Sequence, residues 1–124
     1  MAKKRVLVVD DSSTIRQQVS QVLTQVGFEV IEAEDGQIGA DIIRDDPSIS
    51  VVICDVNMPR LNGIEMVLHV KRDAKNANLP ILMLTTDGQP ALIKKAKEAG
   101  AKGWMVKPFN PSQLVLAVQK LAGP

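Results

Sequence analysis

Short apolar runs recur along the chain, and a segment with helical spacing follows each of them. The runs start near Val6, Phe28, Val51, Ile81 and Trp104. Continuous apolar runs of this length, many of them β-branched, are typical of strands covered on both faces. The run that starts at Phe28 is interrupted by two glutamates, which indicates a strand at the edge of a sheet.

Between these runs the apolar residues take the spacing of amphipathic helices. The clearest case begins at Ile15, with a serine at 12 or 13 to cap its start and Gly27 to end it. Another begins with the capping-box pattern at Asn62 and is expected to bury Ile64, Val67 and Leu68. The remaining helices are expected over about 35–45, before Gly100, and from Asn110 and Pro111 onward.

The alternation of strand and helix predicts an α/β fold, a five-stranded parallel sheet, doubly wound as (βα)5 with helices on both faces. A chain of 124 residues suits one domain. No linker-like stretch interrupts it, so we expect residues 1–124 to form a single domain with no output domain. Ligands of such sheets bind beyond the carboxyl ends of the strands.

Composition narrows the classes of partner. The 15 basic and 14 acidic residues leave a net charge of +1, which gives no general field for nucleic acid or for a membrane surface. No apolar stretch approaches the roughly 20 residues that a membrane helix needs. The lone Cys54 lies in an apolar run and indicates a buried thiol in a reducing cytoplasm. We therefore expect a cytoplasmic protein with no nucleic-acid partner and no membrane insertion.

Acidic residues follow two of the predicted strands. Asp10 and Asp11 end the first strand and Asp55 ends the third, and these strands are neighbours in the common order of such sheets. Two carboxylates ~4 Å apart repel by about 4 kcal/mol at an effective dielectric constant of ~20. Three together favour a cation, and an oxygen-only ligand set suits Mg²⁺. The alternative for Asp10 and Asp11 is a helix cap, whereas Asp55 has no helix to cap before Asn62.

Two further polar residues end strands. Thr85 ends the fourth strand and Lys107 the fifth. A lysine can hold phosphate oxygens as a point charge, and a hydroxyl can donate to another oxygen. Each residue alone is an ordinary strand end, but together with the acids they indicate a site for phosphoryl chemistry.

Four motifs at these spacings make the chain similar to the receiver domain of bacterial two-component response regulators, most closely the stand-alone chemotaxis type. They are Val8-Val9-Asp10-Asp11-Ser12, Asp55-Val56-Asn57-Met58-Pro59 with Gly63, Thr85, and Lys107-Pro108-Phe109. The resemblance covers the whole chain. It implies a flavodoxin-like strand order 2-1-3-4-5, which is known for chemotaxis regulators rather than derived from the pattern, and a cis bond between Lys107 and Pro108.

The resemblance implies that Asp55 accepts a phosphoryl group from the phosphohistidine of a partner histidine kinase. Asp11 and Asp55 would bind Mg²⁺ directly together with the backbone carbonyl of Asn57, and Asp10 would act through water. Thr85 would hold a phosphoryl oxygen, as would the lysine of the last motif. The chain would then catalyse only its own phosphorylation and dephosphorylation, and would not be an enzyme in the usual sense.

The same resemblance implies a switch formed by Thr85 and Trp104. The phosphate would pull the hydroxyl inward and the aromatic ring would follow, which remodels the surface of the fourth helix, fifth strand and fifth helix for a separate effector protein. Trp104 stands where Tyr or Phe is usual, and its indole donates only through nitrogen. A half-buried aromatic with no switching role is the alternative.

Asn57, Thr86 and Asp87 are expected to border the path of the attacking water and to set the lifetime of the phosphoryl group. The expected protein is a monomer, with chemotaxis or flagellar motor control as its pathway. Two other functions stay open. One is an aspartyl-phosphate phosphatase of the haloacid-dehalogenase type, which needs a second acid where Asn57 stands. The other is a docking domain that is never phosphorylated.

Overall fold

In the computed structural model, which describes residues 3–123, five parallel strands form one sheet in the order β2-β1-β3-β4-β5. The strands are β1 (Arg5–Val9), β2 (Glu29–Ala33), β3 (Ile49–Cys54), β4 (Ile81–Thr85) and β5 (Gly103–Val106). The helices are α1 (Ser13–Gln25), α2 (Gly36–Asp45), α3 (Gly63–Lys71), α4 (Pro90–Ala99) and α5 (Pro111–Ala122), with a 3-10 turn η1 (Ala74–Asn76). The predicted fold class, the strand order and the edge position of β2 are confirmed.

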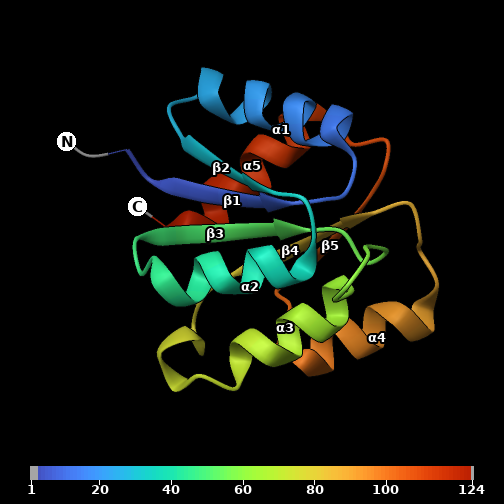
Figure 1. Cartoon of the computed structure of the whole chain (residues 1–124). Helices are drawn as coiled ribbons and strands as arrows, with labels where there is room; N and C mark the ends of the chain where they lie inside the picture. The colour runs from blue at the N-terminus through green and yellow to red at the C-terminus, as the bar shows by residue number, and fades with distance from the viewer. Residues whose placement is uncertain (1–2, 124) are drawn as a thin grey trace.

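The sheet lies between two layers of helices. Helices α1 and α5 cover one face, and α2, α3 and α4 cover the other (Figure 1). Side chains of β1 alternate between the layers: Val6 and Val8 pack toward α1 and α5, and Leu7 and Val9 toward the opposite helices. Full burial of each such side chain stabilises the fold by about 1.5–3 kcal/mol. This explains why the run in β1 is apolar at every position.

The last strand departs from the expectation of cover on both faces. Trp104 and Met105 are only half-buried, and Val106 is 47% exposed. The reason is the position of β5 at the edge of the sheet, where it has a neighbouring strand on one side only. An apolar run therefore predicted the strand correctly but not its degree of burial.

Helix ends follow the local signals in the sequence. The Ser12 side chain accepts the backbone N–H of Ile15 at 3.3 Å and so caps α1. Asn62 and Glu65 form a reciprocal capping box at the start of α3. Gly27, after α1, takes a positive φ of 97°, which a residue without a Cβ adopts without strain.

The expected burial of Leu68 is wrong, because that side chain is 46% exposed. Val67 is buried as expected, and Ile64 is partly buried. The residues that α3 buries fully are Gly63, Met66, Val67 and Val70, the i, i+3, i+4 and i+7 positions of a single stripe. Leu68 lies one position beyond Val67 and so points away from the sheet. None of the helices within residues 3–123 combines the length and hydropathy required to span a bilayer.

Candidate functional site

Polar residues meet at the carboxyl edge of the sheet because adjacent parallel strands end in register. Val9 of β1 pairs with Cys54 of β3, so the next residues, Asp10 and Asp55, come side by side. The Asp55 N–H donates to the Val9 carbonyl at 3.0 Å. Both acids are buried, which is costly for a carboxylate that lacks partners. The register of the sheet thus places two carboxylates side by side where they are shielded from solvent.

Asp11 completes an acidic cluster. One carboxylate oxygen from each of Asp10, Asp11 and Asp55 can be chosen so that all three lie within 4.8 Å of one another. Asp11 is exposed, whereas the other two are buried. Within residues 3–123 no other trio of His, Cys, Asp or Glu side chains comes this close. The structure therefore brings together the three acids that the sequence singled out.

Lys107 supplies the counter-charge. Its Nζ donates to Oδ2 of Asp10 at 2.7 Å and to Oδ2 of Asp55 at 3.0 Å. Burial raises the pKa of the Asp10 carboxyl, against the opposing effect of the hydrogen bonds from Lys107 and the Ser12 N–H. Burial works to lower the pKa of the Lys107 ammonium, but its bonds to the two carboxylates outweigh this and raise that pKa. The ammonium therefore stays charged between the acids.

The Asp55 carboxylate is oriented from both sides. Its Oδ1 accepts the N–H of Val56 at 2.7 Å and that of Asn57 at 3.4 Å, while its Oδ2 faces the lysine. Gly63 packs so closely on this loop that a Cβ there would lie 2.0 Å from the Asp55 carbonyl oxygen. The start of α3 thus fixes the backbone that carries Asp55.

Thr85 is fully buried at the end of β4, and its carbonyl accepts the N–H of Lys107 at 2.8 Å. Among residues 3–123 its hydroxyl accepts a single, long hydrogen bond, from the N–H of Asp87 at 3.4 Å. The Lys107–Pro108 peptide bond is cis, as the resemblance implies. Thr85 and Lys107 therefore flank the acids from the neighbouring strands.

The indole of Trp104 connects β5 to the loop that follows β4. Its Nε1 donates to the carbonyl of Asp87 at 3.1 Å, and the half-buried ring packs against the α2–α4 side of the core. Thr86 and Asn57 are exposed and Asp87 is partly exposed. The residues expected to set the phosphoryl lifetime thus lie on the solvent side of the strand ends.

Two basic residues that the sequence did not mark out lie beside this edge. Arg60 has a positive φ of 68°, and its Nη1 lies 3.4 Å from Oδ2 of the buried Asp35, which also caps α2 through the Ile38 N–H. Arg16 contacts the backbone of Asp10. The sequence carries one signal for Arg16: it is the single charged residue of α1.

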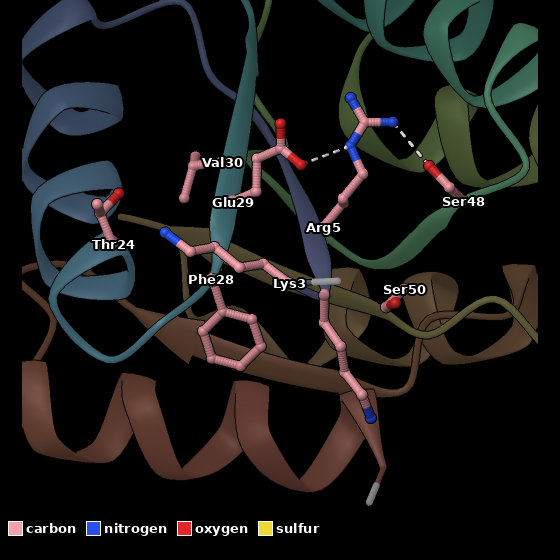
Figure 2. Close-up of a pocket in the computed structure, with 9 residues that line it drawn as sticks. Lys3, Arg5, Thr24, Phe28, Glu29, Val30, Ser48 and Ser50 are labelled. Carbon is pink, nitrogen blue, oxygen red and sulfur yellow. Dashed lines mark hydrogen bonds and ion pairs between the residues drawn. The ribbon is translucent and has the colours of Figure 1, made fainter. Parts of the chain in front are cut away.

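A hollow at the opposite, amino end of the sheet offers no comparable chemistry. Figure 2 shows Arg5 there, paired with Glu29 at 3.1 Å and bonded to Ser48 at 2.7 Å. Lys4 donates to the carbonyl of Ala122 at 2.9 Å. Arg5 and Lys4 of this hollow thus link the start of β1 to β2, to the segment before β3 and to the end of α5. The candidate site is therefore the carboxyl edge of the sheet.

The donor set at the carboxyl edge fits Mg²⁺. Three carboxylates are hard oxygen ligands, and Mg²⁺ prefers a few carboxylates together with waters and phosphate oxygens. Cys54 is buried, and burial raises the pKa of its thiol, which keeps the thiol protonated. A soft thiolate ligand is therefore not part of this site.

This fold, with its acids, hydroxyl and lysine at the ends of four strands, defines a signalling receiver. The family model "Response regulator receiver domain" matches residues 6–119, and the chain belongs to that family. Receiver domains of this kind are signalling proteins rather than classical enzymes. They bind Mg²⁺ at an acidic pocket and interact with histidine kinases and downstream targets.

Two of the similar relatives of the chain are named as chemotaxis proteins. The "Chemotaxis protein CheY homolog" of Campylobacter jejuni is 39% identical over 120 residues, which cover 96% of this chain and 92% of that protein. "Chemotaxis protein CheY1" of Helicobacter pylori is 38% identical and covers 96% and 97%. The solved structure of the chemotaxis response regulator CheY4 of Vibrio cholerae superposes with a TM-score of 0.90 at 42% identity, covering 97% of this chain and 99% of that one.

Proposed function

We propose that this chain is a phosphorylatable switch: Asp55 accepts a phosphoryl group from a partner histidine kinase in a Mg²⁺-dependent reaction. The phosphorylated form then binds a separate effector protein in chemotaxis or flagellar motor control, with the protein acting as a cytoplasmic monomer. One observation carries the proposal. Lys107 bridges the buried Asp10 and Asp55, and Asp11 lies in reach of both.

The transfer step follows from the orientation of Asp55. Backbone N–H groups hold its Oδ1, so we assign Oδ2 as the attacking oxygen. A bond forms from Oδ2 to phosphorus while the phosphorus–nitrogen bond of the phosphohistidine breaks, and the electron pair of that bond returns to the imidazole. When bound, Mg²⁺ would supply positive charge for the phosphoryl oxygens; Asp11, Asp55 and the Asn57 carbonyl would hold it, with Asp10 acting through water.

Lys107 and Thr85 would stabilise the transferred group. The Lys107 ammonium already touches Oδ2 of Asp55, so it can pass to a phosphoryl oxygen as Oδ2 becomes esterified. The Thr85 hydroxyl oxygen accepts a long hydrogen bond from the Asp87 N–H, and its own proton can be donated to a second phosphoryl oxygen. Preorganised donors of this kind stabilise developing charge without moving at the moment of reaction.

The proposed output is the surface formed by α4, β5 and α5. A shift of Thr85 toward the phosphoryl group would pull the loop that carries Asp87, and the bond from Trp104 to the Asp87 carbonyl passes this shift to β5. The same surface presents Val106, 47% exposed, and Leu116, 66% exposed. Exposed apolar side chains on these elements suit a protein partner.

The lifetime of the phosphoryl group would depend on Asn57, Thr86 and Asp87, which lie on the solvent side of the site. Asn57 also bears on the phosphatase alternative, because an amide cannot serve as the second acid of the haloacid-dehalogenase type. A receiver that is phosphorylated on Asp55 is therefore a better fit to this residue set than a phosphatase of that type.

The test uses Trp104, the one tryptophan of the chain, as the reporter. Mg²⁺ is titrated while its fluorescence is followed, with and without acetyl phosphate as a small phosphodonor. We expect a fluorescence change that needs both Mg²⁺ and the donor. A docking domain that is never phosphorylated would show no donor-dependent change, and continuous turnover of phosphate esters would indicate a phosphatase.

Asp11→Ala should stabilise the metal-free protein while abolishing Mg²⁺ binding. The Asp11 carboxylate is exposed and lies close to two other acids, so its removal relieves a repulsion of about 1 kcal/mol. Urea unfolding without metal measures the gain. The control is Ser12→Ala, which removes the actual cap of α1 and should cost about 1 kcal/mol. A loss of stability in Asp11→Ala would show that Asp11 supports the helix instead.

A further inference from the structure

Arg16 reaches from α1 to the backbone of the acidic cluster. Its Nη1 donates to the carbonyl oxygen of Asp10 at 2.6 Å, and its Nε donates to Oε1 of Glu32 at 3.1 Å. The guanidinium is largely buried, whereas the Glu32 side chain is about half exposed. A planar guanidinium can bind two acceptors in fixed directions at once. Arg16 thus clamps the end of β1 to the end of β2.

The carbonyl that Arg16 holds belongs to the peptide bond between Asp10 and Asp11. Because a peptide unit is planar, fixing this carbonyl also fixes the direction in which the chain leaves toward Asp11. Asp10 has further anchors, since its N–H donates to Ala33 and its carboxylate accepts from Ser12 and the lysine. The Asp11 carboxylate makes no hydrogen bond or ion pair to another described residue. Its placement therefore depends on the backbone.

Charge alone would make Arg16 unfavourable here. A cation beside a cation site weakens binding of Mg²⁺ through repulsion. Glu32 compensates for this, because Val8 of β1 and Glu32 of β2 pair in register and the carboxylate lies directly on the guanidinium. This pairing also accounts for one of the two glutamates of the edge strand.

We propose that Arg16 is a positioning residue of the metal site: it holds the Asp10–Asp11 peptide so that Asp11 faces the ion, and Glu32 holds Arg16 in place. The inference rests on the proposed function, since the site it serves is the Mg²⁺ site of the receiver. It assigns a role to a residue outside the acids, the hydroxyl and the lysine.

The two explanations of Arg16, positioning of Asp11 and simple charge, predict opposite changes in Mg²⁺ affinity when Arg16 is replaced. If Arg16 positions Asp11, Arg16→Met weakens Mg²⁺ binding by about tenfold, the effect of losing one hydrogen bond from a charged group. If Arg16 acts only by its charge, the same substitution tightens Mg²⁺ binding. The measurement is the Mg²⁺ dissociation constant from Trp104 fluorescence and calorimetry, combined with the amide NMR shift of Asp11, which reports the hydrogen bond on the Asp10 carbonyl.

Three further variants sharpen the test. Arg16→Lys keeps the charge, but one ammonium cannot reproduce both bonds of the guanidinium, so its Mg²⁺ affinity and Asp11 amide shift should follow Arg16→Met. Glu32→Gln keeps an oxygen acceptor for Nε, so the Asp11 amide shift should stay near wild type, while loss of the compensating charge should weaken Mg²⁺ binding less than Arg16→Met does. Arg44→Met removes an exposed arginine of α2 that pairs with Asp45 and should leave Mg²⁺ binding unchanged.

Several outcomes overturn the inference. If Arg16→Met binds Mg²⁺ as tightly as the wild type, Arg16 does not position Asp11. The same conclusion follows if Arg16→Met binds Mg²⁺ weakly but Arg16→Lys binds it as tightly as the wild type. Lower unfolding stability with unchanged Mg²⁺ affinity would assign it a purely structural role. If Arg16→Met does not fold, the Mg²⁺ affinity and the Asp11 amide shift of Arg16→Lys test the inference in its place. Failure of the wild type to bind Mg²⁺ would overturn the proposed function and this inference together, whereas wild-type binding with an unaffected Arg16→Lys overturns this inference alone.

Discussion

Asp55→Asn abolishes phosphorylation of the chain by acetyl phosphate and leaves the fold intact. The amide has the shape of the carboxylate and keeps an oxygen for the Val56 N–H, which lies 2.7 Å from Oδ1 in the native protein. It lacks the negative oxygen that attacks phosphorus. Removal of a nucleophile costs far more than removal of a supporting group, so we expect the rate to fall by more than about 10³-fold.

Mass spectrometry of the intact protein, with and without the donor and Mg²⁺, measures this result. Asp45→Asn is the matched control, because Asp45 is an exposed acid at the last residue of α2, on the side of the amino ends of the strands and away from their carboxyl ends. This variant should be phosphorylated like the wild type. A donor-dependent mass increase that persists in Asp55→Asn would place the acceptor on another residue. Circular dichroism of the variant separates loss of chemistry from loss of fold.

Among the substitutions considered, Lys107→Met is expected to cause the largest loss of folding stability in the absence of metal. The side chains of Asp10 and Asp55 are only 3% and 9% exposed, and Lys107 is the cation that bridges them. Breaking a buried ion pair by removing one partner costs about 3–5 kcal/mol, because it leaves uncompensated charge in a dry environment. Methionine preserves most of the apolar stem, so packing contributes little to the difference.

Two dependences identify the cause of this loss. Saturating Mg²⁺ should restore part of the stability of Lys107→Met, about 2.7 kcal/mol at a concentration of 100 times the dissociation constant. The stability of Lys107→Met should also recover as the pH falls. Burial raises the pKa of Asp10 in the folded protein, and in the variant Lys107 no longer opposes that shift. Because a carboxyl whose pKa is higher in the folded than in the unfolded state stabilises the fold when it is protonated, lowering the pH should stabilise the variant.

The alkaline range provides the converse check. The pKa of Lys107 is raised in the folded protein, so its contribution is fully present below the ordinary lysine value of about 10.4 and is lost as the pH rises through the folded value. Wild type should show this loss and Lys107→Met should not. Lys97→Met, an exposed lysine of α4, should change stability by less than about 0.5 kcal/mol. Equal stability of wild type and Lys107→Met would mean that the pair contributes nothing.

Helix α3 and strand β5 show where sequence patterns stop being sufficient. The capping box at Asn62 fixed the start of α3, yet the pattern misplaced Leu68, which is 46% exposed. The rotation of a short helix on a sheet is set by its neighbours, and Leu and Val at adjacent positions compete for the same stripe. Similarly, Val106 is apolar but lies on an edge strand, a property of the whole sheet.

The sequence by itself determined the five strand–helix units, the ends of the strands and the gathering of Asp10, Asp55 and Thr85 at one edge. It could do so because hydrophobic period and capping are local, and because parallel strands carry their ends to the same side. Only the tertiary structure decided that Lys107 bonds to acids 97 and 52 residues away, that Arg16 meets Glu32, and that Trp104 donates to Asp87. These contacts depend on strand register and on the paths of the loops, which bring residues distant in sequence within a few ångströms. Neither can be derived from a single local segment of the sequence.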